Sequence, residues 1–231
     1  METRVKQIDL KGLIFQYRET GEMSAQPLIA LHALGQNAES WDGVAAVLGG
    51  KYRVLALDQR GHGGSTRTGI YSFELMCEDL LLFANAMGLE RFTLMGHSMG
   101  GTVSYLFSER HPSRIERLVV EDTPPPFLHK KIEIPSEPPG YQLPFDWFVL
   151  PSILQQLNEP NPEWWARLTE ILSPTLIIGG GSTSPVPQNK LKEVSDLIRT
   201  CELVTIEGAG HNVHEANLLA FLAAVKPFLN V

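Results

Sequence analysis

The sequence predicts an α/β fold: a mostly parallel, twisted sheet with helices on both faces and one inserted segment. Three observations predict it. Short apolar runs alternate with segments of helical periodicity up to residue 122 and again from residue 174. Glycine-rich turns follow several of the apolar runs. A length of 231 residues suits one domain built on a single large sheet.

The expected elements follow from residue spacing. Residues 4–18 alternate apolar and polar side chains around Gly12, which predicts a β-hairpin. Short apolar runs, typical of strands buried on both faces, cover residues 27–32, 52–57, 91–95, 115–121, 174–178 and 202–206. Helical spacing covers residues 37–48, 72–87, 99–111, 188–199 and 213–229.

Residues 123–173 differ in composition from the predicted core, which comprises residues 1–122 and 174–231. They are rich in proline and aromatic residues, and this density of proline excludes long helices and central strands. We expect a small cap with short helices near 146–157 and 162–172. Within it, Trp147, Phe148, Trp164 and Trp165 either line an acyl or alcohol pocket or pack within the cap itself.

Composition narrows the function classes. The net charge of −7 and the pI of about 5.5 argue against a nucleic-acid partner, and no apolar run is long enough to span a membrane. Residues 1–6 lack the apolar core of a signal peptide, and Cys77 and Cys201 provide no disulfide framework, so we expect a cytoplasmic protein. No metal-binding or nucleotide-binding motif occurs, so we expect neither a metal nor a cofactor. The sequence does not predict the oligomeric state.

Candidate site residues follow the predicted strands. The carboxyl ends of parallel strands meet at one edge of a sheet, so His32, Asp58, Ser98, Asp122 and His211 are expected there. The motif Gly96-His97-Ser98-Met99-Gly100 fits a tight strand-to-helix turn, in which the glycines leave room for the backbone and the Ser98 hydroxyl is exposed.

Four ordered motifs make the chain resemble the α/β-hydrolase family over essentially its whole length, with small-cap serine esterases the most similar members. They are Leu31-His32-Ala33-Leu34-Gly35, residues 58–65 (DQRGHGGS), the turn at Gly96-His97-Ser98-Met99-Gly100-Gly101, and Gly208-Ala209-Gly210-His211. A serine at the turn separates the chain from similar family members that use aspartate there, such as haloalkane dehalogenases and epoxide hydrolases.

The resemblance implies a role for each matching residue. Ser98 is the expected nucleophile and His211 its general base. The backbone N–H groups of Met99 and Leu34 are the expected oxyanion hole. Ala33 stands where the family usually has glycine, which restricts the backbone of this loop.

The expected acid departs from the family pattern. The loop after residues 174–178, where the family usually places an aspartate, has no carboxylate and offers only hydroxyl groups, including those of Thr183 and Ser184. In some members the acid follows the strand that here ends in Glu121-Asp122, so we favour Asp122, with Ser184 or Thr183 next and Glu121 last.

The resemblance therefore implies a cofactor-independent serine hydrolase that cleaves an ester or related small acyl compound through an acyl-enzyme. Lactonase, thioesterase, carbon–carbon bond hydrolase or lyase, amidase and cofactor-free peroxidase-like activities share this machinery. A non-hydrolytic ligand receptor is the alternative from another class, favoured only by the missing loop aspartate.

Overall fold

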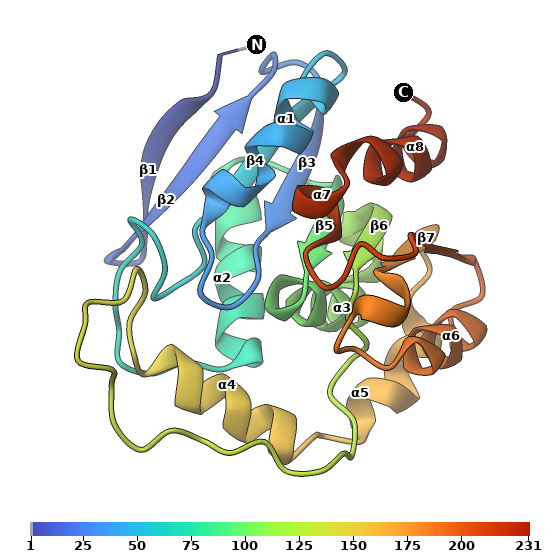
Figure 1. Cartoon of the computed structure of the whole chain (residues 1–231). Coiled ribbons are helices and arrows are strands. Elements are labelled where there is room, and N and C mark those ends of the chain that lie inside the picture. The colour runs from blue at the N-terminus through green and yellow to red at the C-terminus, as the bar shows by residue number, and fades with distance from the viewer. Residues whose placement is uncertain (1) are drawn as a thin grey trace.

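Eight strands form where the apolar runs were expected, in the computed structural model, which describes residues 2–231 (Figure 1). They are β1 (Arg4–Leu10), β2 (Leu13–Thr20), β3 (Gln26–Leu31), β4 (Tyr52–Leu57), β5 (Phe92–His97), β6 (Ile115–Glu121), β7 (Thr175–Gly179) and β8 (Cys201–Thr205). The sheet order is β1-β2-β4-β3-β5-β6-β7-β8. Only β1 with β2 and β2 with β4 pair antiparallel, so the predicted mostly parallel sheet is confirmed.

Helices alternate with the strands. The α-helices are α1 (Asp42–Leu48), α2 (Phe73–Ala86), α3 (Met99–Arg110), α4 (Val149–Asn158), α5 (Glu163–Ala166), α6 (Gln188–Leu197), α7 (Val213–Ala216) and α8 (Leu218–Leu229). Short 3₁₀ segments are η1 (Ala38–Trp41), η2 (Pro112–Arg114), η3 (Arg167–Glu170) and η4 (Gly181–Thr183). No helix of residues 2–231 combines the length and the apolarity that crossing a bilayer requires.

Two expected helices are each divided. Residues 37–48 form η1 followed by α1, and residues 213–229 form α7 followed by α8. Asn217 explains the second break, because its backbone is non-helical and its side chain caps α8 by accepting a hydrogen bond from the Ala220 N–H. Asn37 likewise caps η1 through the Glu39 N–H.

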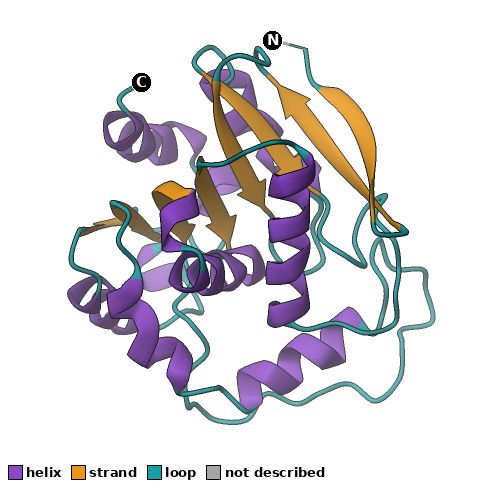
Figure 2. Ribbon diagram, turned by 180° about the vertical axis from the view of Figure 1, so that it is seen from behind, coloured by secondary structure: helices purple, strands orange, loops and turns teal. Residues whose placement is uncertain are grey.

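The sheet separates two cores. In β3, Ile29 and Leu31 face the core beneath α2, α3 and α6, whereas Leu28 and Ala30 face the core beneath α1 and α8. Figure 1 shows α1 and α8 against one face, and Figure 2 shows α2 and α3 against the other. Burial of alternate side chains on opposite faces explains why these strands read as continuous apolar runs.

Residues 123–173 leave the sheet between β6 and β7 and carry α4, α5 and η3. Figure 1 shows α4 and α5 beyond the carboxyl ends of the central strands. Val149 and Ile153 of α4 pack into the core beneath α2, and the Asp146 N–H donates to the carbonyl of Gly61. This segment therefore lies over the sheet edge where the candidate residues gather.

The turn between β5 and α3 is strained and tightly packed. Ser98 has φ of 52° and ψ of −114°, a backbone conformation that L-residues rarely adopt. A Cβ on Gly100 would lie 2.4 Å from the carbonyl oxygen of Leu31, and one on Gly96 would lie 2.4 Å from that of Gly100. The glycines predicted to flank Ser98 are thus required by the approach of β3 and α3.

We expect Gly100→Ala to lower the free energy of unfolding by about 3 kcal/mol or more, because the methyl group would meet main-chain atoms of β3 that cannot rotate away. Urea denaturation followed by circular dichroism measures the change. Gly50→Ala is the matched control, since a Cβ there meets no atom within 4 Å. Equal stability of the two variants would contradict this account of the turn.

Candidate active site

Ser98 lies at the carboxyl edge of the sheet, held between neighbouring strands. Its N–H donates to the Glu121 carbonyl over 3.2 Å, and the Gly100 N–H donates to the His32 carbonyl over 3.2 Å. The turn is thereby tied to the ends of both β6 and β3, so the position of the Ser98 hydroxyl is set by the sheet itself.

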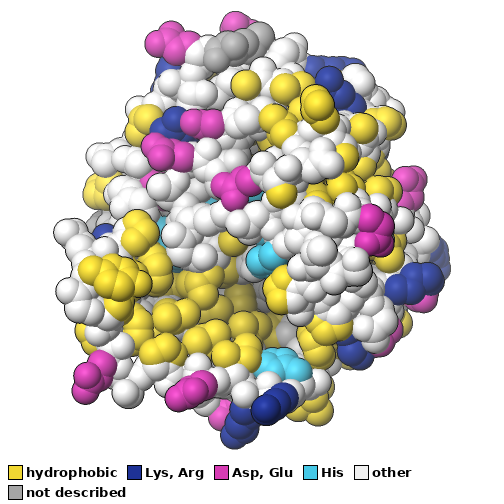
Figure 3. Space-filling model, viewed as in Figure 1, with side chains coloured by type: hydrophobic (Ala, Val, Ile, Leu, Met, Phe, Trp, Pro, Cys, Tyr) yellow, Lys and Arg dark blue, Asp and Glu magenta, His cyan; other side chains and the backbone are white. Residues whose placement is uncertain are grey.

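Ser98 and His211 open onto a common pocket of about 500 Å³. Figure 3 shows hydrophobic side chains gathered in and around a hollow on the lower part of this face. The walls come from the loops after β3, β7 and β8, the turn at Ser98, helices α2, α3 and α4, and residues 123–132. The lining residues are Leu34, Phe73, Ser98, Met99, Thr102, Thr123, Pro124, Pro125, Pro126, Phe127, His129, Ile132, Ile153, Leu157, Pro185, Val186, Pro187 and His211. Because none of these is Lys, Arg, Asp or Glu, the pocket suits an uncharged, largely apolar group.

The structure places Asp122 against His211. The Nδ1 of His211 lies 2.8 Å from Oδ2 of Asp122, which is fully buried, whereas the His211 side chain is 30% exposed. An ionised carboxylate only accepts hydrogen bonds, so Nδ1 carries the proton and Nε2 keeps its lone pair. No hydrogen bond joins the Ser98 hydroxyl to the His211 ring within residues 2–231, although both groups border the same pocket. Such contacts often tighten only when substrate binds.

The Asp122 carboxylate is held ionised by its hydrogen bonds. Oδ1 accepts from the Gly180 N–H at 2.8 Å and the Gln188 amide at 3.0 Å, while Oδ2 accepts from the Ser184 hydroxyl at 2.5 Å and from His211. Burial alone raises the pKa of Asp122, but these bonds outweigh burial and bring the pKa below its ordinary value.

The loop without a carboxylate therefore contacts Asp122 rather than His211. Ser184 donates to the carboxylate, and Gln188 adds a second side-chain donor. Glu121 points elsewhere and bonds His214. Of the four residues considered for the acid, the structure brings only Asp122 into hydrogen-bond contact with the His211 ring.

The two residues expected to provide the oxyanion donors also line the pocket. Neither the Leu34 nor the Met99 N–H donates to another group within residues 2–231, and both residues line the cavity. The His32 ring donates from Nδ1 to the Ala33 carbonyl, which belongs to the same peptide unit as the Leu34 N–H. Fixing this carbonyl fixes the direction of the amide. Ala33 does not have a positive φ, so alanine is tolerated in place of glycine.

Two neutral imidazoles support this loop. The Nε2 of His32 accepts from the Gln59 N–H at 3.0 Å, and the Nε2 of His62 accepts from the Gly35 N–H at 3.2 Å. Burial lowers the pKa of His32 to about 4 and that of His62 to about 3. His62 was not among the expected site residues, although its place in the glycine-rich loop after β4 puts it beside His32, at a ring distance of 4.8 Å.

Two possibilities were open for the four cap aromatics, and the lining of this cavity includes none of Trp147, Phe148, Trp164 and Trp165. Trp164 is buried one layer behind it, edge-on to Phe73 at 5.7 Å, and Trp165 donates to the Pro126 carbonyl at 2.9 Å. Phe148 is 56% exposed and Trp147 is half-buried. The lining instead includes Ile153 and Leu157, whose spacing by one turn of α4 was the available sequence signal.

One group of side chains within residues 2–231 has metal-ligand chemistry: His97, Glu121 and His214, whose ligand atoms lie within 4.8 Å of one another. The Nδ1 of His214 and Oε2 of Glu121 are hydrogen bonded at 2.6 Å, and Nε2 of His214 lies 3.1 Å from the Ser40 carbonyl. These atoms are engaged with protein partners, so the geometry fits a buried ion pair better than a metal centre.

We expect the stability to fall by about 3 kcal/mol per pH unit as the pH decreases from 6 to 5. Burial lowers the pKa of His97 to about 4, so in this range His32, His62 and His97 take up protons on unfolding. Glu109 offsets one of these protons, because burial raises its pKa to about 8 and the folded state already holds that proton. Urea denaturation at several pH values measures the slope. His62→Gln should make it shallower, because one proton fewer is taken up on unfolding. An unchanged slope in that variant would contradict the assignment.

Comparison with known proteins agrees with this architecture. A family model described as the alpha/beta hydrolase fold matches residues 26–148. Among curated relatives, the sn-1-specific diacylglycerol lipase ABHD11 of Danio rerio is 26% identical, covering 90% of this chain and 80% of that protein. The protein of the same name from Mus musculus is 27% identical, covering 96% and 87%.

Solved structures show the same fold. A hydrolase from Pseudomonas aeruginosa PA01 superposes with a TM-score of 0.85 at 24% identity, covering 98% of both chains. The enol-lactonase from Burkholderia xenovorans LB400 has a TM-score of 0.81 at 20% identity, covering 98% of this chain and all of that one. With the family model matching more than half of its length, the chain belongs to the α/β-hydrolase fold family and is an enzyme of the hydrolase class.

Proposed function

We propose that this protein is a cofactor-independent serine hydrolase that cleaves uncharged esters of apolar acyl groups. One observation carries the proposal: a serine on a strained turn shares an apolar pocket with an imidazole whose far nitrogen is bound to a buried carboxylate. This arrangement supplies a nucleophile, a general base and a group that orients the base.

The proposed reaction uses this chain's own groups. His211 Nε2 removes the hydroxyl proton of Ser98 as the oxygen attacks the ester carbonyl, and the Leu34 and Met99 N–H groups bind the oxyanion. His211 then donates that proton to the departing alcohol, leaving an acyl group on Ser98. Water, deprotonated by His211, then attacks the acyl carbonyl, the bond to the Ser98 oxygen breaks, and His211 returns the proton to Ser98 as the acid leaves. Asp122 stays ionised and stabilises the imidazolium in both steps.

The lining of the pocket supports the substrate class. A substrate carboxylate or phosphate would find no cationic side chain among the lining residues. The relatives named diacylglycerol lipase agree with an ester of an apolar acyl chain.

We further propose that residues 123–173 act as the cap of this pocket, because Phe127, Ile132, Ile153 and Leu157 all line it. The free thiols of Cys77 and Cys201 support cytoplasmic localisation.

Lactones and thioesters could be cleaved by the same catalytic groups, and each is tested by measuring its hydrolysis by the unmodified protein and by Ser98→Ala. A non-hydrolytic receptor was favoured only by the missing loop aspartate. The contact between Asp122 and His211 supports a hydrolase instead, because it provides a carboxylate for the histidine.

We expect short- and medium-chain p-nitrophenyl esters to be hydrolysed with a burst of about one equivalent of p-nitrophenol, because acylation by these activated esters is faster than hydrolysis of the acyl-enzyme. Ser98→Ala should abolish both the burst and covalent labelling by a fluorophosphonate. Ser108→Ala is the matched control, since this buried hydroxyl lies on α3 and donates only to the Ser104 carbonyl. Turnover by Ser98→Ala, or absence of labelling in the unmodified protein, would refute the proposal.

We expect Asp122→Asn to lower kcat by about 10³–10⁴-fold, because the amide favours the wrong tautomer of His211. Ser184→Ala removes one of four hydrogen-bond donors to the carboxylate and should cost about tenfold or less. Steady-state kinetics on a p-nitrophenyl ester compares the two variants. A larger loss from Ser184→Ala than from Asp122→Asn would transfer the orienting role to the hydroxyl.

A further inference from the structure

Strand β6 ends in two consecutive carboxylates, and each holds one imidazole. Asp122 bonds His211, and Glu121 bonds His214, three residues further along the chain. Asp122 has φ of 45°, which turns the backbone at the strand end. Only the Asp122 pair reaches the pocket, through His211, because the lining includes neither Glu121 nor His214. The second pair takes no part in the proposed reaction and requires another explanation.

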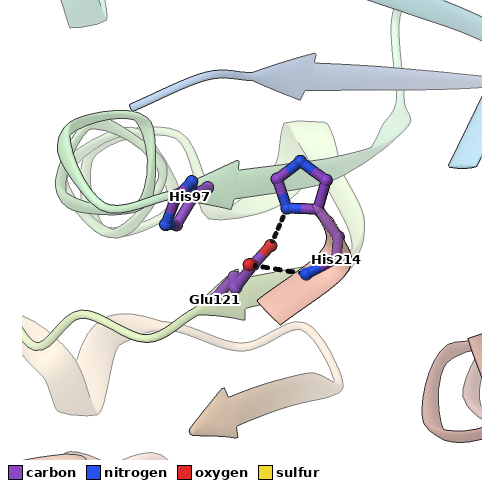
Figure 4. Close-up of side chains that lie close together, drawn as sticks. All are labelled: His97, Glu121 and His214. Atoms are coloured by element: carbon purple, nitrogen blue, oxygen red, sulfur yellow. Dashed lines mark hydrogen bonds and ion pairs between the residues drawn. The ribbon is translucent and has the colours of Figure 1, made fainter. Parts of the chain in front are cut away.

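The Glu121–His214 pair is built as a clamp on the main chain. Oε2 of Glu121 lies 2.6 Å from Nδ1 of His214, and Oε1 accepts from the His214 backbone N–H at 3.0 Å (Figure 4). The Nε2 of His214 faces the Ser40 carbonyl at 3.1 Å, so both ring nitrogens face acceptors and the ring is an imidazolium. Trp41 stacks on it at 4.2 Å with an interplanar angle of 10°, as a cation over an aromatic face does.

His97 extends this clamp to the residue proposed as the base. It is paired in register with Glu121 across β5 and β6, so the two side chains share one face of the sheet. Its Nε2 lies 2.8 Å from the main-chain carbonyl oxygen of His211, to which it donates. The His97 ring also packs against the rings of both His211 and His214, at 4.8 Å and 5.4 Å. Residues 211–214 are therefore held at both ends.

The clamp matters because two glycines precede His211, and ordering them costs backbone entropy. Gly208 and Gly210 both have positive φ, and glycine loses more backbone freedom on ordering than any other residue. The Gly210 N–H donates to the Gly180 carbonyl, but beyond it the His97 bond is the contact that fixes the His211 carbonyl. Small displacements of a base relative to its nucleophile can reduce the rate about 100-fold.

We propose that His97, Glu121 and His214 form a positioning cluster that sets the location of the His211 imidazole from beneath the active site. The inference rests on the proposed function only for its kinetic readout. None of the three residues borders the substrate pocket, so the cluster acts through the main chain of residues 211–214.

The test compares three variants. His97→Leu removes the donor to the His211 carbonyl. His97→Gln restores one, since the amide nitrogen of glutamine occupies about the position of imidazole Nε2. Tyr52→Phe is the matched control, because it removes a buried side-chain bond to a main-chain carbonyl, that of Leu229 at 3.0 Å, in the same core but away from His211. Kinetics on a p-nitrophenyl ester, urea denaturation and the NMR signal of the His211 Nδ1 proton are the readouts.

We expect His97→Leu to lower kcat by about ten- to a hundredfold with KM nearly unchanged. Its His211 Nδ1 proton signal should broaden or disappear, and His97→Gln should recover most of both. Tyr52→Phe should lose comparable stability while keeping kcat and the signal. If His97→Leu instead behaves like Tyr52→Phe in both readouts, the cluster is merely structural and the proposal is overturned.

A second variant covers failure of His97→Leu to fold. Glu121→Gln keeps the shape of the side chain and removes the charge that holds His214, and should lower kcat about three- to tenfold and broaden the same NMR signal. An unchanged signal and kcat in Glu121→Gln would likewise overturn the proposal. If the unmodified protein proves not to be a hydrolase, the proposed function fails by itself, and the NMR signal still decides the positioning role.

Discussion

The structure depends on the burial of two adjacent carboxylates at the end of β6. An ionised carboxylate removed from water must find opposite charge or hydrogen-bond donors, or it becomes protonated. For Asp122 the donors come from the loop after β7, from α6 and from His211; for Glu121 they come from His214. The requirement to satisfy these two groups draws the segment after β8 onto the sheet edge where Ser98 lies. The main-chain carbonyl of Glu121 meanwhile accepts from the Ser98 N–H, so one dipeptide connects the turn at Ser98 with residues 211–214.

Burial affects the charges of neighbouring histidines in opposite ways. Burial of His214 lowers its pKa, as burial of His97 does, but the charge and hydrogen bond of Glu121, with Glu215 and the Ser40 carbonyl, together outweigh burial and raise the pKa. His97 lies near the same carboxylate without a hydrogen bond to it, and burial together with the neighbouring imidazoles lowers its pKa to about 4. One negative charge stabilises one imidazolium, and the second ring stays neutral. Neutrality suits the contact that His97 makes, since a single N–H is all that the His211 carbonyl requires.

Sequence patterns predicted most of the fold because local and global signals agree along this chain. Strands β4 and β5 are buried at every position and mostly apolar, and Gly96 and Gly100 indicate the tight turn at Ser98. The breaks at residues 41–42 and 217 were missed because helical periodicity continues through them, while capping by Asn37 and Asn217 is a local effect.

The site was less predictable than the fold. Asp122 could be proposed from the empty loop after β7, but its contacts with Ser184 and Gln188 depend on how that loop and α6 return to the sheet. The pocket lining could not be assigned from aromatic content. Two of the largest side chains of residues 123–173 hold this segment in place instead. Trp164 packs on Phe73, and Trp165 donates a hydrogen bond to the Pro126 carbonyl. His97, Glu121 and His214 look unrelated in sequence and meet only because β5 and β6 are paired in register.

Because the carboxylate that contacts His211 follows β6, the loop after β7 does not have to provide it, and the tip of that loop is freer to vary in sequence. In this protein, the tip formed by Pro185, Val186 and Pro187 is part of the cavity wall and provides no acid. Exchanging these three residues would alter the shape offered to an acyl chain while the Asp122–His211 pair keeps its scaffold on the adjacent strand. Selectivity for chain length can thus be changed at residues 185–187, in evolution or by engineering, without replacing either Asp122 or His211.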